Sequence, residues 1–151
     1  MPDSDRLIAF DRGADEAAPP RDAPLPLALF ALWCGDRVLL VFDRHRKAWE
    51  LPDGMIEPPE SPREAAVREL REETGQVPDG PVTFVGYARF ALGPEQRPEY
   101  GALFAGRCVT PREFRPNEEI AAVRWWDPQN RAPSRVEAID LGLARLSGPA
   151  R

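Results

Sequence analysis

The alternation of apolar and polar positions along the chain predicts an ordered domain built from strands and helices. Five segments combine apolar residues with strand-forming side chains and end at turn-forming residues. A tight turn at Gly35-Asp36 would join the first two of them into a hairpin. The five segments are Leu25–Cys34, Arg37–Phe42, Val82–Leu92, Tyr100–Val109 and Ile120–Trp126.

Two segments carry the signature of a helix N-terminus. Ser61-Pro62-Arg63-Glu64 places an N-cap serine, a proline at the first helical position and a glutamate at the third, which is a capping box, and Gly75 is expected to end this helix. Ser134-Arg135-Val136-Glu137 predicts a second helix, ending at Gly148. Strands and helices therefore interleave in a mixed α/β or α+β fold, with about two helices packed on a largely β core. The apolar side of the second helix would comprise Val136, Ile139, Leu143 and Leu146.

Length and composition indicate one globular domain. The chain has 151 residues, of which 42% are hydrophobic and 30% charged. Residues 1–24 are rich in Asp, Ala and Pro and are expected to form a flexible tail or a loosely attached strand, whereas residues 25–148 would form the domain. The longest apolar run, Leu25–Cys34, is half of the ~20 residues that a membrane-spanning helix needs. With no secretory signal visible and only two cysteines, the sequence favours the cytoplasm.

The negative charge is concentrated in one window. The formal net charge is −5, and residues 50–75 hold eight acids and three bases, so the remainder of the chain is neutral. Such a balance argues against a protein that holds a nucleic-acid backbone. Within the expected helix, Glu69, Glu72 and Glu73 fall in a sector roughly 100° wide. These carboxylates repel one another, so they form either a solvated acidic face or a site for a divalent cation.

A glutamate-rich motif spans residues 54–76, after a compact turn expected over residues 49–54. Its spacing is Gly, five residues, Glu, seven residues, Arg-Glu, an aliphatic residue, one residue, Glu-Glu, one residue, Gly. This pattern resembles the box of the Nudix hydrolases, of MutT-like type. Asp53, where many members have glycine, and Gln76, where they have an aliphatic residue, depart from it. The matching residues are Gly54, Glu60, Arg68, Glu69, Leu70, Glu72, Glu73 and Gly75.

The resemblance implies an α/β/α sandwich with a mixed sheet, and hydrolysis of a nucleoside diphosphate linked to another group. One to three Mg²⁺ or Mn²⁺ ions would be held by Glu69, Glu72, Glu73 and the Gly54 carbonyl. Glu69, or alternatively Glu72, would deprotonate the attacking water, while Arg68 orients the carboxylates and Glu60 acts from the preceding loop. Glu118 and Glu119 stand where the family often has a further ligand, although they equally fit two solvated loop acids.

The substrate is less clearly marked than the metal site. A MutT-like nucleoside triphosphate pyrophosphohydrolase is the leading interpretation, followed by an ADP-ribose or nucleotide-sugar pyrophosphatase, and then by a non-catalytic nucleotide-binding module. We expect a small-molecule nucleotide as the partner, with no stable binding of nucleic acid and no membrane contact. The sequence is compatible with either a monomer or a homodimer. Candidate substrate-binding residues are Arg44 and Arg46, which fit a plain surface connector better, and Tyr87, Arg89 and Arg107 on two strands.

Overall fold

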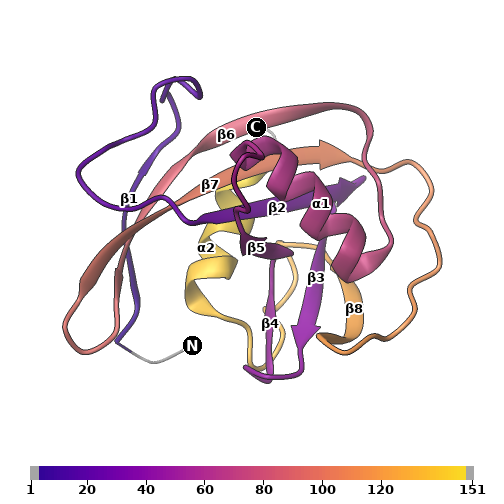
Figure 1. The fold of residues 1–151 in the computed structure, drawn as a ribbon. Coiled ribbons are helices and arrows are strands. Elements are labelled where there is room, and N and C mark those ends of the chain that lie inside the picture. The colour runs from indigo at the N-terminus through magenta and orange to yellow at the C-terminus, as the bar shows by residue number, and fades with distance from the viewer. Residues whose placement is uncertain (1–3, 149–151) are drawn as a thin grey trace.

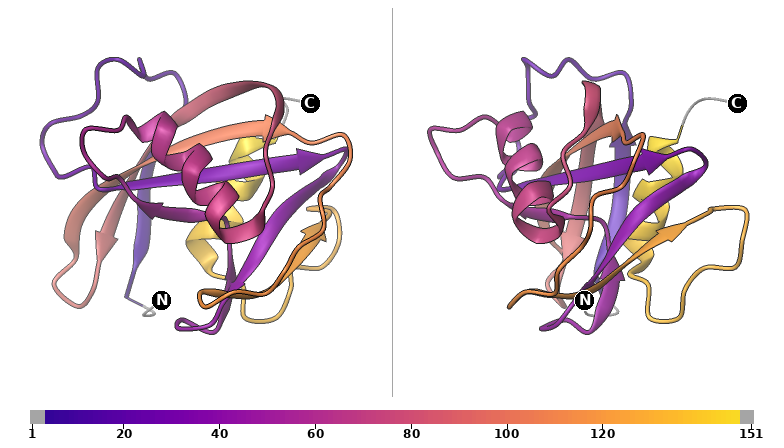
Figure 2. Two further views of the ribbon diagram at one scale, coloured as in Figure 1. Left: turned by 45° about the vertical axis from the view of Figure 1, so that its right-hand side comes forward. Right: turned by 90° about the vertical axis from the view of Figure 1, so that its right-hand side faces the viewer.

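A computed structural model describes residues 4–148 of the chain. An eight-stranded mixed sheet lies between two helices, which cover opposite faces in the side views of Figure 2. This arrangement confirms the expected α/β/α sandwich. The elements, shown in Figure 1, are β1 (Arg6–Asp11), β2 (Leu27–Cys34), β3 (Arg37–Asp43), β4 (Ala48–Glu50), β5 (Asp53–Met55), α1 (Pro62–Thr74), β6 (Asp79–Leu92), β7 (Arg97–Arg107), β8 (Ile120–Trp126) and α2 (Ala138–Ser147).

Strand β2 lies at the centre of the sheet. It pairs in parallel with β7, from Leu27 opposite Gly101 to Trp33 opposite Arg107. On its other side it pairs with β5 near its start and with β3 at the hairpin turn near its end. From that turn β3 diverges to pair with β4 and β8. Strands β5 and β8 both contact α1.

Buried apolar side chains form one cluster on each face of the sheet. Leu29, Ala31 and Trp33 of β2 belong to the cluster under α2, whereas Phe30 and Leu32 belong to the cluster under α1. Successive residues of a strand point to opposite faces, so a strand covered on both faces must be apolar throughout. That requirement explains the uninterrupted apolar sequence of β2. The α1 cluster is completed from the helix by Ala65, Ala66 and Leu70.

The capping box at the start of α1 is confirmed. The Ser61 hydroxyl accepts a hydrogen bond from the Glu64 amide, and the Glu64 carboxylate accepts one from the Ser61 amide. At the other end Gly75 adopts a left-handed conformation with φ of 74°, and its N–H donates to the Arg71 carbonyl. Both ends of α1 are therefore set by local sequence, which places its acidic residues in a defined register.

Replacement of Ser61 by alanine should lower the free energy of unfolding by about 1 kcal/mol, because the N-cap hydrogen bond to Glu64 is lost. The thermal midpoint should fall by roughly 2–4 °C in a domain of this size. Ser134→Ala is the matched control, because Ser134 caps no helix in the structure. Equal melting temperatures for the two variants would contradict the capping role of Ser61.

The second predicted capping box is wrong. Helix α2 begins at Ala138, and its N-cap Glu137 makes no side-chain capping bond. Residues 135–137 instead bind the edge strand β4, because the Trp49 amide donates to the Arg135 carbonyl at 2.9 Å and the Glu137 amide donates to the Trp49 carbonyl at 3.0 Å. Pairing with a distant strand has overridden the local signal. The end of the helix at Gly148 and the burial of Ile139 and Leu143 agree with the prediction.

The compact turn expected over residues 49–54 contains parts of two short strands. Ala48–Glu50 forms β4 against β3, and Asp53–Met55 forms β5 against β2. Three-residue strands have no detectable alternation of their own and depend on their partners in the sheet. The important consequence is that β5 holds Gly54 directly beneath α1, since Gly54 pairs with Ala28 of the central strand.

The N-terminal segment contacts the domain through β1 and through the loop that follows it. Strand β1 pairs antiparallel with β6. The Glu16 carboxylate then binds the Arg63 guanidinium of α1 through two hydrogen bonds, of 2.7 and 2.9 Å.

In the part of the chain that the structure describes, no helix has the length and apolar character needed to cross a membrane.

Candidate metal centre

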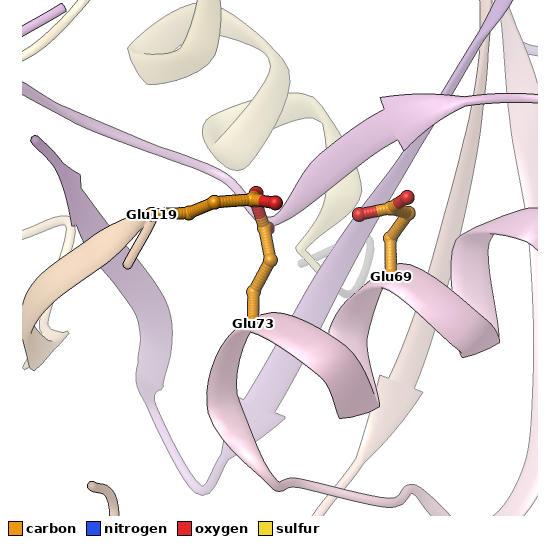
Figure 3. Close-up of side chains that lie close together, drawn as sticks. All are labelled: Glu69, Glu73 and Glu119. Carbon is orange, nitrogen blue, oxygen red and sulfur yellow. The ribbon is translucent and has the colours of Figure 1, made fainter. Parts of the chain in front are cut away.

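Three carboxylates from two separate parts of the chain meet beside α1. Glu69 and Glu73 are one helical turn apart on the same face of the helix, and Glu119 immediately precedes β8. One oxygen of each lies within 4.8 Å of the others. Figure 3 shows Glu69 and Glu73 projecting from the helix and Glu119 reaching toward them from the opposite side. This carboxylate cluster is the strongest candidate for a cation site among the described residues.

Burial makes the negative charge of the carboxylate cluster unfavourable. Glu73 is only 5% exposed, and burial, followed by repulsion from Asp53, Glu69 and Glu119, raises the pKa of Glu73 to about 10. Burial also raises the pKa of Glu69, although a hydrogen bond from Arg68 opposes this effect. The positive charge of Arg68 therefore offsets the acidity of the cluster only in part. A hard divalent ion with a preference for oxygen ligands would supply more positive charge, so the donor set fits such an ion.

Gly54 leaves the space that Glu69 occupies. A Cβ atom built at Gly54 would lie 2.1 Å from the Glu69 Cδ and 2.4 Å from its Oε1. Any side chain at this position would therefore displace the carboxylate. The glycine identified from the motif is required here by close contact with a residue of the cluster, and it lies where its own backbone could approach a bound ion.

We expect Gly54→Ala to weaken Mn²⁺ binding by roughly 10- to 100-fold, the usual effect of disturbing a group that positions a ligand. The measurement is a calorimetric titration of the metal-free protein. Gly13→Ala is the control, because the nearest atom to its added Cβ lies 3.9 Å away. Unchanged affinity in Gly54→Ala would show that the ion does not depend on the Glu69 position.

Arg68 links the loop glutamate to the helix glutamates. Its guanidinium donates to both Glu60 oxygens at 2.7 and 3.0 Å, to Glu69 at 2.7 Å and to Glu72 at 3.1 Å. A further bond goes to the Met55 carbonyl, at 3.0 Å. This geometry supports an orienting function for Arg68, and Glu60 contacts the guanidinium through two hydrogen bonds. Glu72 has a side chain 56% exposed and is not within the carboxylate cluster.

Glu72 and Glu118 lie beside the carboxylate cluster. With Glu73, Asn117 and Glu119 they line a cavity of about 290 Å³. Glu118 is exposed, and the cluster of three does not include it. The sequence could not distinguish Glu118 from Glu119, since both precede β8. The structure separates them by bringing only Glu119 to Glu69 and Glu73.

Asn117 is a site residue that the sequence analysis missed. Its side-chain oxygen accepts hydrogen bonds from the amides of Glu119 and Ile120, at 3.0 and 2.9 Å, and its side-chain nitrogen donates to the Glu73 carbonyl at 3.0 Å. Asn117 therefore fixes the backbone of one cluster residue against that of another. An Asn two residues before the glutamate and ahead of a strand is typical of an Asx turn, and this signal could have identified it.

Gln76, one of the departures from the motif, tethers the same segment. It is 2% exposed, its side-chain nitrogen donates to the Arg112 carbonyl at 2.7 Å, and its oxygen accepts from the Arg112 amide at 2.9 Å. An aliphatic residue could not make these bonds. Gln76, two residues beyond the end of α1, thus anchors Arg112 in the first half of the 109–119 segment.

Asp53, the other departure, adds a fourth carboxylate beside the cluster. Its amide donates to the Glu73 carboxylate at 3.1 Å. Burial, followed by repulsion from Glu50, raises the pKa of Asp53 to about 8, whereas Arg46 opposes the shift. Arg46 itself binds Glu50 through two hydrogen bonds, of 2.6 and 2.8 Å. Arg46, a candidate for substrate binding, is therefore paired with acidic residues of its own chain.

The remaining substrate-binding candidates lie away from the carboxylate cluster or are engaged within the fold. Arg44 donates to the Asn117 carbonyl at 2.7 Å and so supports the loop that carries Glu119. Tyr87 is 4% exposed, and its hydroxyl donates to the Glu16 carbonyl at 2.7 Å. Arg89 donates to the Asp22 carboxylate at 2.6 Å. Arg107 is exposed at the far end of β7, beside a separate cavity of about 430 Å³.

The fold is an α/β/α domain. Within it, helix α1 of the glutamate-rich motif contributes two carboxylates to a site suited to a divalent ion. The model of the NUDIX domain matches residues 24–143. The chain therefore belongs to the NUDIX family, which confirms the family predicted from the motif.

Sequence and structure comparisons agree with this family. The chain is 33% identical over 92 residues to a proposed 8-oxo-dGTP diphosphatase of Bacillus subtilis, covering 61% of this chain and 58% of that protein. It is 46% identical over 57 residues to an RNA pyrophosphohydrolase of Cereibacter sphaeroides, covering 38% and 32% of the two chains. Less than two thirds of each relative is thus matched. The fold is similar to that of a MutT NUDIX hydrolase from Burkholderia pseudomallei, with a TM-score of 0.71 at 15% identity, over 84% of this chain and all of the other.

Proposed function

We propose that the protein hydrolyses the pyrophosphate linkage of a nucleoside triphosphate in the presence of Mg²⁺ or Mn²⁺. The observation that carries this proposal is the carboxylate cluster, in which Glu119 joins Glu69 and Glu73 of the NUDIX motif. A diphosphate substrate brings several negative charges to a site that is already acidic. When bound, the cation would neutralise the charge of the substrate and that of the carboxylates, and it would favour ionisation of a coordinated water.

The residues of the chain have separable functions in this proposal. Glu69, Glu73 and Glu119 would hold the metal, with Gly54 and Glu72 contributing when substrate is present. Glu69 is the first choice for accepting the proton of the attacking water, because its carboxylate is partly exposed and belongs to the carboxylate cluster. Arg68 would keep the Glu69 carboxylate oriented, and Glu60 would hold Arg68.

A second candidate substrate is the 5′-triphosphate end of RNA. The supporting observation is the similarity of one segment of this chain to RNA pyrophosphohydrolases, at 46% identity over 57 residues. The same carboxylate cluster would serve for this reaction, because the bond that is broken is again a phosphoric anhydride. The two substrates differ in the nucleotides that follow the first, and no basic surplus exists on the chain to bind them.

The test is an assay of the purified protein with Mg²⁺ against nucleoside triphosphates, 5′-triphosphorylated RNA, ADP-ribose and a nucleotide sugar. We expect release of pyrophosphate from at least one nucleoside triphosphate, with the monophosphate as the second product. Faster turnover of the RNA would favour the second candidate, and turnover of ADP-ribose or the nucleotide sugar alone would favour a pyrophosphatase of that class. Nucleotide binding without turnover of any compound would indicate a non-catalytic module.

A further inference from the structure

The two cysteines of the chain lie side by side, although 73 residues separate them. Cys34 is the last residue of β2, and Cys108 directly follows β7. The preceding residues, Trp33 and Arg107, are partners in the parallel ladder, and the Cys108 amide donates to the Trp33 carbonyl at 2.8 Å. The cysteines therefore occupy the next position of the same ladder.

Their side chains also point to the same face of the sheet. Cys108 belongs to the apolar cluster under α1, and Cys34 packs against that cluster. The Cys34 thiol donates to the Val109 carbonyl, with its Sγ 3.7 Å from the oxygen, so it is turned toward the chain that directly follows Cys108. Adjacent strands of a sheet lie about 4.8 Å apart, which is within the range of about 4.4–6.8 Å found between the Cα atoms of disulfide-bonded cysteines.

The two thiols differ in their access to solvent. Cys34 is partly exposed, whereas Cys108 is only 5% exposed. Burial raises the pKa of the Cys108 thiol, and the neighbouring Cys34 adds to the shift. A small oxidant would therefore meet Cys34 first, while Cys108 is held within reach to react second.

We propose that Cys34 and Cys108 form a site of oxidative modification, at which a hydroperoxide converts the two thiols into an intramolecular disulfide. The Cys34 thiolate attacks one peroxide oxygen, so that an S–O bond forms, the O–O bond breaks, and water leaves after protonation when the oxidant is hydrogen peroxide. The Cys108 thiolate then attacks the Cys34 sulfur, so that the S–S bond forms and hydroxide leaves as a second water. Two thiols lose two electrons and two protons, and one peroxide is reduced to two waters.

The bond would act on the segment that carries Glu119. Residues 109–119 follow Cys108 directly. Gln76, just after α1, binds Arg112 of this segment, and Asn117 of the segment binds the Glu73 carbonyl of α1. A disulfide would fix the first residue of this segment to β2. Oxidation should therefore reduce the freedom of the segment and raise the thermal midpoint by roughly 5–10 °C, because the bond closes a long loop in the unfolded chain.

The experiment treats the reduced full-length chain with hydrogen peroxide, blocks remaining thiols, and maps peptides by mass spectrometry without reduction. We expect a Cys34–Cys108 peptide in the monomer, loss of both titratable thiols, a higher thermal midpoint, and reversal of all three by dithiothreitol. Cys34→Ser should form no disulfide, and its thermal midpoint should not respond to peroxide. Because Cys34 is partly exposed, this variant is expected to fold.

Three outcomes would overturn the proposal. They are a sulfinic or sulfonic acid at Cys34 with Cys108 still a free thiol, a disulfide only between two copies of the chain, and no oxidation of either thiol. All of these readouts are independent of turnover, so failure here is distinguishable from failure of the proposed hydrolase activity.

Discussion

Glu69→Gln is expected to lower kcat for nucleoside triphosphate hydrolysis by roughly 10²- to 10⁴-fold, the range typical of a lost general base. Glutamine has nearly the same shape, so the substitution removes only the charge and the basic oxygen. The hydrogen bond from Arg68 to Oε1, at 2.7 Å, can still form with the amide oxygen. The measurement is steady-state kinetics with saturating Mg²⁺, together with calorimetric titration of the ion.

The stability of Glu69→Gln separates a chemical effect from misfolding. Burial raises the pKa of Glu69, which means that its charge is unfavourable in the metal-free fold. The metal-free variant should therefore melt at the same temperature as the wild type or higher. Glu95→Gln is the control, since Glu95 is an exposed residue of the turn between β6 and β7. Wild-type kcat in Glu69→Gln would exclude Glu69 as the base and direct attention to Glu72.

The parts of the fold that the sequence predicted are those decided by local interactions. The capping box at Ser61, the left-handed Gly75 and the apolar β2 all arise from neighbours in the chain or from simple alternation. The prediction for Ser134 failed because residues 135–137 bind Trp49, more than eighty residues earlier in the chain. A capping motif indicates the conformation that a segment favours in isolation. The edge of a sheet can offer the same backbone groups other hydrogen-bond partners, as Trp49 does here.

The candidate site shows the same division. Spacing on one helix predicted that Glu69 and Glu73 share a face, and the structure agrees. The helical wheel could not show that Glu72, in the same sector, would bind Arg68 outside the carboxylate cluster. Nor could it show that Asn117 would hold the segment of Glu119 against the helix. Those features depend on contacts between elements far apart in sequence. The pairing of Tyr87 with the Glu16 backbone is hidden from strand alternation for the same reason.

Mg²⁺ binding is expected to strengthen by about tenfold per pH unit as the pH rises from about 6 to 8. The pKa of Glu73 is raised to about 10, so the metal-free protein carries a proton on this carboxylate near neutral pH. An ion can bind the carboxylate only after this proton has left. Calorimetry in two buffers with different ionisation enthalpies should therefore detect release of about one proton for each ion bound.

The stability of the metal-free protein should change with pH in the opposite direction. The pKa of Glu73 in the folded state lies above its ordinary value of 4.5, so the folded chain binds more protons than the unfolded chain between these limits. The free energy of unfolding must then fall as the pH rises from about 4.5 toward 10, and Mg²⁺ should suppress the decline. Glu73→Gln should abolish both the proton release and this part of the pH dependence. If the wild type binds Mg²⁺ with no proton release and a pH-independent affinity, then Glu73 is not a ligand and the ion must lie away from the carboxylate cluster.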